Sequence, residues 1–207
     1  MTSSERNPAG SGRAALRWWS ALQPRRPDGT RNPARNTAAL AELRRASVPI
    51  DAIENDAAID LYDRLFPGGR SSQFDRLLRV GTLACVLAHV RQHEERSRAG
   101  EWLTVARAVG LQDLSNPTSA PMSPLRFRRL LAARGEDEVL TCFRRLVALA
   151  GHTVNIVDLA ESILDWADDE AGDRRRVRWA FDYHGAGRAR PGAPAMNSPL
   201  AASEPTP

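Results

Sequence analysis

Apolar residues recur at every third or fourth position along most of this chain, which is the spacing of one face of an α-helix. Over residues 56–66, for example, Ala58, Leu61 and Leu65 fall on the same side of a helix. No stretch alternates with the period of two that is typical of a half-buried strand. We therefore predict an all-α protein. Helices are expected over about 13–22, 33–46, 56–66, 74–92, 101–109, 125–134, 136–150, 154–167 and 174–183.

The helix expected over residues 74–92 differs from the others because apolar residues cover both of its faces. Leu77 and Cys85 lie on one face, whereas Leu83 and Val86 lie on the other. A helix that is apolar all round is usually buried. We predict that this helix is the centre of an N-terminal bundle.

Proline-rich and glycine-rich segments divide the chain. A loop over residues 115–124 contains three prolines and marks the best candidate boundary in a chain of 207 residues. The chain ends are rich in Ser, Gly, Pro and Ala and offer little to bury. We therefore predict two tandem helical bundles, residues 13–110 and 111–184, with disordered tails over residues 1–12 and 185–207.

Composition removes several classes of chemistry. All 29 basic side chains are arginine, and a Walker P-loop, a pyridoxal Schiff base and a Ser-x-x-Lys acylation site each require a lysine. The two cysteines lie in helical patterns, which indicates neither a disulfide scaffold nor a cysteine-rich zinc site. The sequence has no apolar run near the roughly 20 residues of a membrane span, and its start lacks a signal-peptide pattern. We expect a soluble, cytoplasmic protein without a membrane partner.

Two groups of residues resemble catalytic or metal sites. His89 and His93 are four positions apart, but the sequence offers no evident third ligand, so we interpret both as structural. Carboxylates cluster at the end of the helix expected over 154–167, as in a two-metal nuclease, but such a cluster beside a basic helix is more often solvated or ion-paired. Its members are Asp165, Asp168, Asp169, Glu170 and Asp173. We predict no enzymatic activity and no cofactor.

The arginines between residues 126 and 145 are the more informative feature. In the helix expected over 125–134, Phe127 and Leu130 face inward. At about 100° per residue, Arg126 and Arg129 then lie about 60° apart on the outer side, and Arg128 flanks the other edge. Guanidinium groups are always charged and bind phosphate oxygens in pairs, so neighbouring arginines suit a nucleic-acid backbone.

The next helix repeats this arrangement, because Arg144 and Arg145 flank the inward-facing Phe143. We predict that Arg126, Arg129, Arg144 and Arg145 line one DNA-holding face. Few aromatic residues lie between the arginines, so base stacking is not the expected mode of binding. The alternative interpretation is that these arginines are a solvated face whose side-chain stems cover the protein's own core.

Charge is also segregated along the chain, although the net charge is only +4. Residues 13–45 hold 8 arginines and 2 acidic residues, whereas residues 51–75 hold 6 acidic residues and 2 arginines. Opposite charges in separate regions form basic and acidic faces. We expect these two regions to be able to meet across subunits of an assembly.

Seven short elements appear in an order that is typical of one known family. They are A-L-R-W-W over 15–19, the helix with Arg35, Leu40, Leu43, Arg44, Arg45 and Ala46, R-F-R-R-L-L over 126–131, F-R-R-L-V over 143–147, V-D-L over 157–159, D-W over 165–166 and R-W-A-F-D-Y over 178–183. Together they cover about residues 13–184 and resemble the small subunit (CasB-type) of the type I-E CRISPR surveillance complex, Cascade. The chain departs from the family pattern at Asn32-Pro33 and at His184, where a second tyrosine is commoner.

The resemblance implies a protein of two helical bundles without catalytic activity. Family members pair with a second copy of themselves, join the other Cascade subunits beside the CRISPR RNA, and stabilise the R-loop by holding strands of the target DNA. Base pairing then supplies sequence specificity, and the protein contacts only the backbone. The candidate nucleic-acid-binding residues are Arg35, Arg44, Arg45, Arg126, Arg128, Arg129, Arg144 and Arg145.

Two alternative functions remain open. A free-standing helical DNA-binding regulator requires a helix-turn-helix with base-reading side chains, and residues 126–145 contain no Asn or Gln, which disfavours it. A purely protein-binding helical scaffold would bind no nucleic acid even at low salt.

Overall fold

The computed structural model describes residues 10–25, 29–33, 35–67, 74–96, 100–113 and 116–186. Within these residues the α-helices are α1 (Ser11–Leu22), α2 (Thr37–Arg45), α3 (Asp56–Leu65), α4 (Phe74–Leu87), α5 (Val105–Ala108), α6 (Pro124–Ala132), α7 (Glu136–Leu149), α8 (Ile156–Trp166) and α9 (Asp169–His184). Two 3₁₀ turns, η2 (Pro49–Ala52) and η3 (Pro117–Ser119), and two short strands, β1 (Gln92–His93) and β2 (Thr153–Val154), complete the described part. The all-α prediction is confirmed.

Asparagine and aspartate side chains fix where several helices begin. Asn36, Asn55 and Asn155 each accept a hydrogen bond from a backbone N–H in the first turn of α2, α3 and α8. Asp168 does the same for α9, which therefore begins about five residues before its predicted start. Gly172 lies inside α9, where an added Cβ would be 2.7 Å from the Trp166 carbonyl oxygen.

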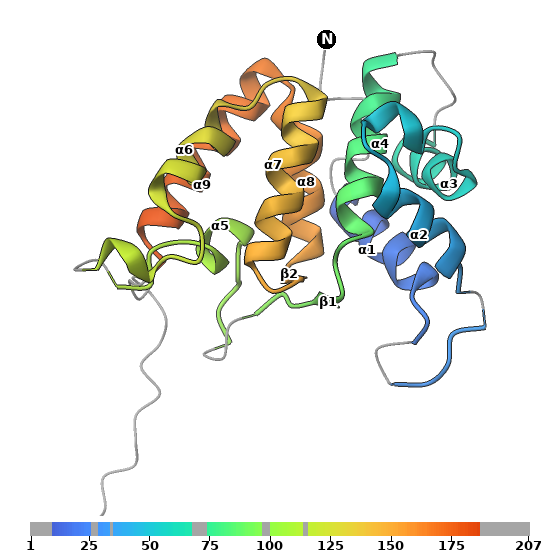
Figure 1. Cartoon of the computed structure of the whole chain (residues 1–207), viewed down its shortest axis with the longest axis horizontal. Coiled ribbons are helices and arrows are strands. Elements are labelled where there is room, and N and C mark those ends of the chain that lie inside the picture. Colours follow the sequence, from blue (N-terminus) through green and yellow to red (C-terminus); the bar gives the residue numbers. More distant parts are fainter. Residues whose placement is uncertain are drawn as a thin grey trace, which may run out of the picture.

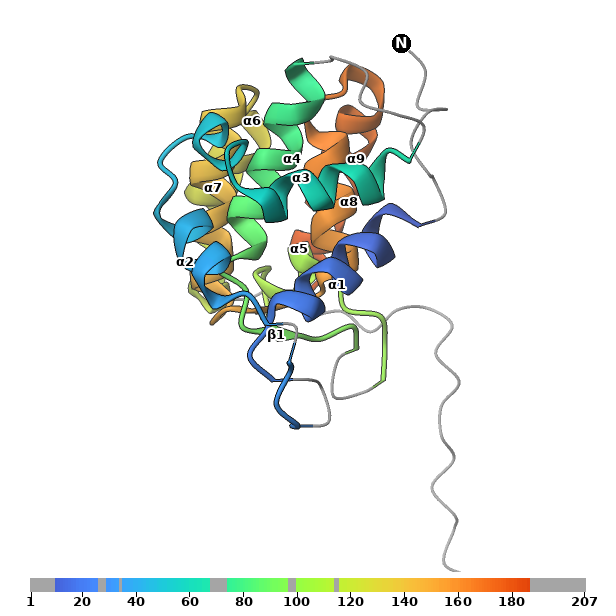
Figure 2. The same ribbon diagram turned by 90° about the vertical axis from the view of Figure 1, so that its right-hand side faces the viewer.

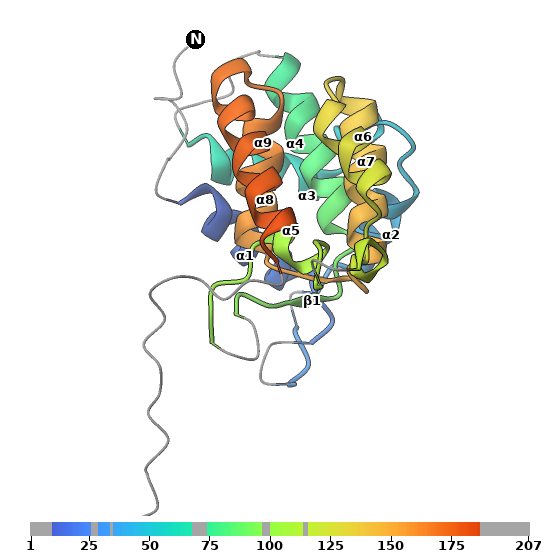
Figure 3. The ribbon, with the colours of Figure 1, turned by 90° about the vertical axis from the view of Figure 1, so that its left-hand side faces the viewer.

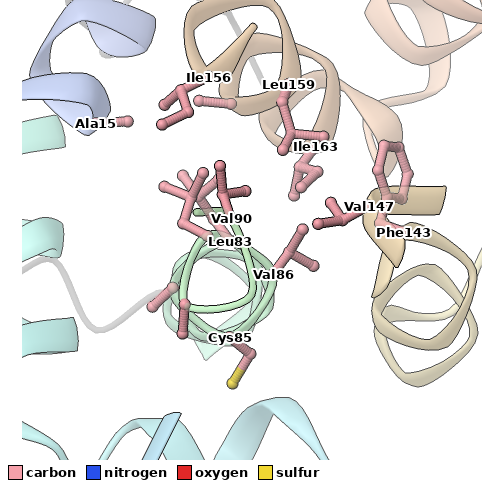
Figure 4. Close-up of a cluster of buried hydrophobic side chains, with 14 of the residues drawn as sticks. Ala15, Leu83, Cys85, Val86, Val90, Phe143, Val147, Ile156, Leu159 and Ile163 are labelled. Atoms are coloured by element: carbon pink, nitrogen blue, oxygen red, sulfur yellow. The ribbon is translucent and has the colours of Figure 1, made fainter. Parts of the chain in front are cut away.

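Helix α4 is the central helix, as predicted. It contacts α2, α3, α7, α8 and η2, and each of its residues from Val80 to Leu87 is buried. Figure 4 shows Leu83 and Val86 pointing toward α7 and α8, whereas Cys85 points to the opposite side. Gly81 lies so close to η2 that an added Cβ would be 2.5 Å from the Pro49 carbonyl oxygen. Burial on every side thus explains why this helix is apolar all round.

The predicted helix over 74–92 ends early, at Leu87. The backbone N–H groups of Arg91 and Gln92 both donate to the His152 carbonyl oxygen, at 2.9 and 3.2 Å. This contact leads into the parallel pairing of β1 with β2. The helical pattern did not reveal this pair because each strand is only two residues long.

The helices fall into two groups, α1 to α4 and α5 to α9, which lie side by side (Figure 1). One continuous cluster of buried residues runs through both groups, and α1 packs along α8 (Figure 2). Helix α5 contacts α9, although the sequence assigns it to the first bundle. The division between residues 110 and 111 stays a prediction.

The chain ends differ slightly from expectation. Ser11 and Gly12, inside the tail expected over 1–12, are helical and buried because the first turn of α1 packs directly on α8. Residues 1–9 and 187–207, the greater part of both predicted tails, lie outside the described residues. Among the described residues, no helix is long and apolar enough to cross a membrane.

Candidate nucleic-acid interface

Helix α6 is fixed by its buried face. Phe127 and Leu130 are buried, as predicted, and the Phe127 ring stacks on Tyr183 of α9 with 3.9 Å between ring centroids. The Tyr183 hydroxyl in turn donates to the Met122 carbonyl oxygen at 2.7 Å. With this face inward, Arg126, Arg128 and Arg129 are all exposed.

These three arginines have no hydrogen-bond or ion-pair partner among the described residues. Helix α6 itself contains no acidic residue that a guanidinium could reach one turn away. No direct ion pair within the described part of the protein therefore neutralises their positive charges.

Arg129 and Arg145 lie together on a groove between α6 and α7, two helices that run alongside each other (Figure 3). The groove has a volume of about 550 Å³, and Asp137, Glu138 and Cys142 also line it. Burial raises the pKa of the Cys142 thiol and Glu138 raises it further, whereas the Arg145 and Arg129 guanidiniums lower it. Both arginines are thus within electrostatic range of the groove, which also carries opposing negative charge.

The two arginines of α7 lie in different surroundings. Arg145 is exposed and has no polar partner among the described residues, whereas Arg144 is half-buried and donates from Nη2 to the Leu43 carbonyl oxygen of α2 at 3.1 Å. Phe143, which directly precedes the two arginines, is fully buried, as predicted. Arg144 therefore lies on the α2 side of α7, and it does not share the groove with Arg129 and Arg145.

The candidates around α2 form a second group. Arg35 is exposed just before the helix. Arg44 donates from Nε to the Ala88 carbonyl oxygen at 2.6 Å. Arg45 is exposed on a groove of about 400 Å³ that Glu42, Asp51 and Glu54 also line. The eight predicted arginines thus divide into a group on α6 and α7 and a group around α2.

The histidine pair does not face a common point. His93 lies in β1, where its ring accepts from the Ile156 N–H at 3.1 Å and contacts Glu95. His89 lies beyond the end of α4, and its carbonyl oxygen contacts the His152 ring at 2.9 Å. Among the described residues, no group of three or more His, Cys, Asp or Glu side chains is arranged to hold a metal ion.

The carboxylate cluster is occupied by arginines of α9. Arg175 binds Asp165 at 2.7 Å, Arg174 pairs with Glu170, and Asp168 caps α9. Another exposed carboxylate near the start of α9, Asp173, binds the buried Arg176 at 3.0 Å. The sequence analysis interpreted this cluster as solvated or ion-paired, and the ion pairs agree with that interpretation, although it did not name the arginines. The signal was present for two of them, because acidic residues precede Arg174 by four positions and Arg176 by three.

Comparison with known proteins gives one match. A family model described as CRISPR-associated protein Cse2 matches residues 39–184, which is well over half of the chain. Neither the curated proteins nor the solved structures that were searched contain a match. The matched range includes most of α2 and all of α3 through α9, and so covers seven of the eight candidate arginines, all except Arg35. The chain therefore belongs to the CRISPR-associated protein Cse2 family, which confirms the resemblance to the small subunit of the type I-E Cascade complex.

Proposed function

We propose that this protein is a non-catalytic, nucleic-acid-binding subunit of the CRISPR RNA-guided surveillance complex, and that it stabilises the R-loop through arginine contacts to the nucleic-acid backbone. Family membership supports its place in the complex. The observation that carries the binding function is the set of exposed arginines on α6 and α7 that have no partner among the described residues. We call Arg126, Arg128, Arg129 and Arg145 the arginine face.

The arginine face suits backbone contacts for three reasons. Guanidinium groups keep their charge at any physiological pH and match the geometry of phosphate oxygens. Helix α6 is anchored by the stacked Phe127 and Tyr183 rings, so its arginines project from a rigid element. Its exposed side offers no Asn or Gln to read base edges, which leaves specificity to base pairing with the guide RNA.

The proposed partners are the other Cascade subunits, a second copy of this chain, the CRISPR RNA and the target DNA. Helix α3 supports pairing between copies, because Asp56, Asp60 and Asp63 are exposed on it. Arg17 on α1 and Arg35 before α2 are exposed in the basic region that such an acidic surface would attract.

Reconstitution tests the proposal. The complex is assembled with its guide RNA and with wild-type protein, without the protein, or with the Arg126→Ala/Arg129→Ala double variant, and the lifetime of the R-loop is measured. We expect the double variant to assemble and to shorten the lifetime toward that of the complex without the protein. The matched control is Arg174→Ala/Arg178→Ala, which removes two arginines of α9 that already have carboxylate neighbours. A lifetime equal to wild type in the first double variant would overturn the proposed role.

A purely protein-binding scaffold is the second candidate, and exposed apolar residues on α9 favour it. Val177 and Phe181 are 58% and 76% exposed and lie four positions apart on one side of the helix. Exposed aromatic residues are enriched at protein interfaces. This function predicts that Phe181→Ala prevents incorporation into the complex, whereas the arginine variants change nothing.

A further inference from the structure

The ends of α2, α4 and α7 meet at a junction that brings basic side chains together from different elements. Arg44, at the end of α2, donates from Nε to the Ala88 carbonyl oxygen just beyond α4, at 2.6 Å. Arg144, on α7, donates from Nη2 to the Leu43 carbonyl oxygen of α2, at 3.1 Å. Each guanidinium is thus held in place by one backbone carbonyl and retains further N–H donors.

Two histidines complete this group. The His152 ring contacts the His89 carbonyl oxygen at 2.9 Å, which ties the turn after α7 to the segment after α4. His152 also has a φ of 63°, a left-handed conformation that is uncommon for a residue with a side chain. This contact holds the His152 ring beside His89, whose neighbour Ala88 accepts the hydrogen bond from Arg44.

Two side-chain nitrogens of this junction are unpaired. His89 Nε2 and Arg144 Nε are buried and have no hydrogen-bond partner among the described residues. Arg144 Nε is a donor, and His89 Nε2 becomes a donor when the imidazole is protonated. A buried polar atom without a partner costs free energy, so both atoms point to a missing partner.

The charged side chains that act on His89 are cationic. Burial lowers the pKa of His89 to about 4, and Arg144, Arg44 and His152 lower it as well, whereas a hydrogen bond with the Arg44 backbone opposes the shift. Arg144 also acts on the Cys85 thiol. Burial raises the pKa of Cys85 to about 11, Arg144 lowers it, and Asp51 of η2 raises it. The junction thus collects cationic groups from α2, α7 and the two following turns around a neutral imidazole.

We propose that Arg44, His89, Arg144 and His152 form a binding site for one phosphate group, either a phosphodiester of nucleic acid or free inorganic phosphate. A tetrahedral oxyanion offers several acceptor oxygens, which suits a group of donors supplied by different elements. Arg44 is exposed and the other three residues are half-buried, so the anion would enter from the Arg44 side. The site is separate from the arginine face, so an experiment can disprove either proposal without disproving the other.

The bound anion would also change the protonation of His89. A negative charge within about 4–6 Å favours the imidazolium form, which then donates from Nε2 to the anion. Arg144 Nε would gain an acceptor when the same anion binds. His89 is therefore a direct reporter of the site.

Nuclear magnetic resonance of protein with ¹³C-labelled histidine tests the site. The pH titration of His89 is followed in chloride, in inorganic phosphate at equal ionic strength, and with a short single-stranded oligonucleotide. We expect the His89 pKa to rise by about 1–3 pH units when phosphate or oligonucleotide is bound. His93, whose ring contacts the Ile156 N–H and Glu95, serves as the internal control and should not change.

Variants separate this site from a general salt effect. Arg44→Gln should raise the His89 pKa in chloride, because one cation is lost, and should abolish the further rise with phosphate. Arg45→Gln, on the exposed neighbour, should retain that rise. Arg144→Gln is the second variant, checked by circular dichroism because it also breaks the contact with Leu43.

The outcomes distinguish the sources of the phosphate. A rise with oligonucleotide alone identifies a phosphodiester site, and a rise with both ligands identifies a general phosphate site. Equal His89 titrations in chloride, phosphate and oligonucleotide would overturn the proposal, whatever the arginine face binds.

Discussion

Helices α6 and α9 are the two most arginine-rich helices of the described structure, yet their arginines lie in opposite surroundings. On α9, Arg175 and Arg176 point inward and bind Asp165, Asp173 and the Trp166 carbonyl. On α6, each arginine is exposed and has no partner among the described residues. Arginine content is therefore a poor guide to nucleic-acid binding. What matters is whether the fold places an acceptor within reach of each guanidinium.

The acidic residues explain the difference. Helix α9 begins with Asp169, Glu170 and Asp173 and packs on α8, whose Asp165 faces it. Helix α6 begins with Ser123-Pro124 and has no acidic residue over its length. Arginines of α9 thus stabilise the contact of α9 with α8, whereas those of α6 are free to bind a partner.

The largest expected effect is on stability, at Arg176. Its guanidinium is buried, donates to the Trp166 carbonyl oxygen at 2.5 Å and lies 5.2 Å from the centre of the Trp166 ring. Arg176→Ala leaves that carbonyl unsatisfied and removes the ring contact, so the free energy of unfolding should fall by about 2–3 kcal/mol. Urea unfolding measures this change, and an unchanged midpoint would show that α9 does not depend on its arginines.

The second effect is pH-dependent and reports on the burial of His89 beside Arg144, the inward neighbour of the exposed Arg145. The pKa of His89 is lowered from 6.5 to about 4, so the unfolded chain binds a proton more readily between these values. Stability should therefore fall by about 1–2 kcal/mol as the pH drops from 6.5 to 4, a figure discounted because His89 is partly exposed. His89→Gln should remove this part of the pH dependence in thermal unfolding. If wild type and His89→Gln gave equal stability–pH curves, His89 would not be held neutral at this junction.

The third effect concerns the affinity of the arginine face for single-stranded DNA. Asp137 lines the groove with Arg129 and Arg145 and opposes their charge. Asp137→Asn should strengthen binding of single-stranded DNA about two- to fourfold, because it removes one repulsive charge at a solvent-exposed site. Fluorescence anisotropy measures the affinity. Weaker binding in this variant would show that the DNA does not lie in the groove beside Asp137.

The smallest effect concerns an exposed pair on α9. Arg174 and Glu170 form an ion pair four positions apart, with both side chains largely exposed. Arg174→Ala should change the free energy of unfolding by less than about 0.5 kcal/mol, because water screens such pairs. The same urea experiment as for Arg176 checks it. A loss as large as at Arg176 would erase the distinction between the inner and outer arginines of α9.

Periodicity predicted the helices and their buried faces because burial follows the same repeat as the backbone. Phe127, Phe143 and the all-round apolar α4 lie where the sequence places them. The early end of α4 and the β1–β2 pair depend on contacts with His152, about 60 positions away in the chain, which no local pattern contains.

The candidate site was only partly predictable for a similar reason. The sequence identifies the exposed side of α6, because exposure follows directly from the position of Phe127 on the helix. It does not show that Arg144 contacts Leu43 of α2, because that depends on how α2 packs against α7. Nor does it show that Asp137 and Glu138 share the groove with Arg129.

The salt dependence of single-stranded DNA binding tests the central claim most directly. Each phosphate contact contributes about 0.7 to the slope of log affinity against log salt concentration. Arg126→Ala/Arg129→Ala should therefore weaken binding to any sequence and flatten the slope by about 1–1.5, with helical circular dichroism and melting temperature unchanged. Arg174→Ala/Arg178→Ala should leave the slope as in wild type. A folded α6 double variant with wild-type affinity and slope would contradict the account and show that these arginines are only a solvated surface.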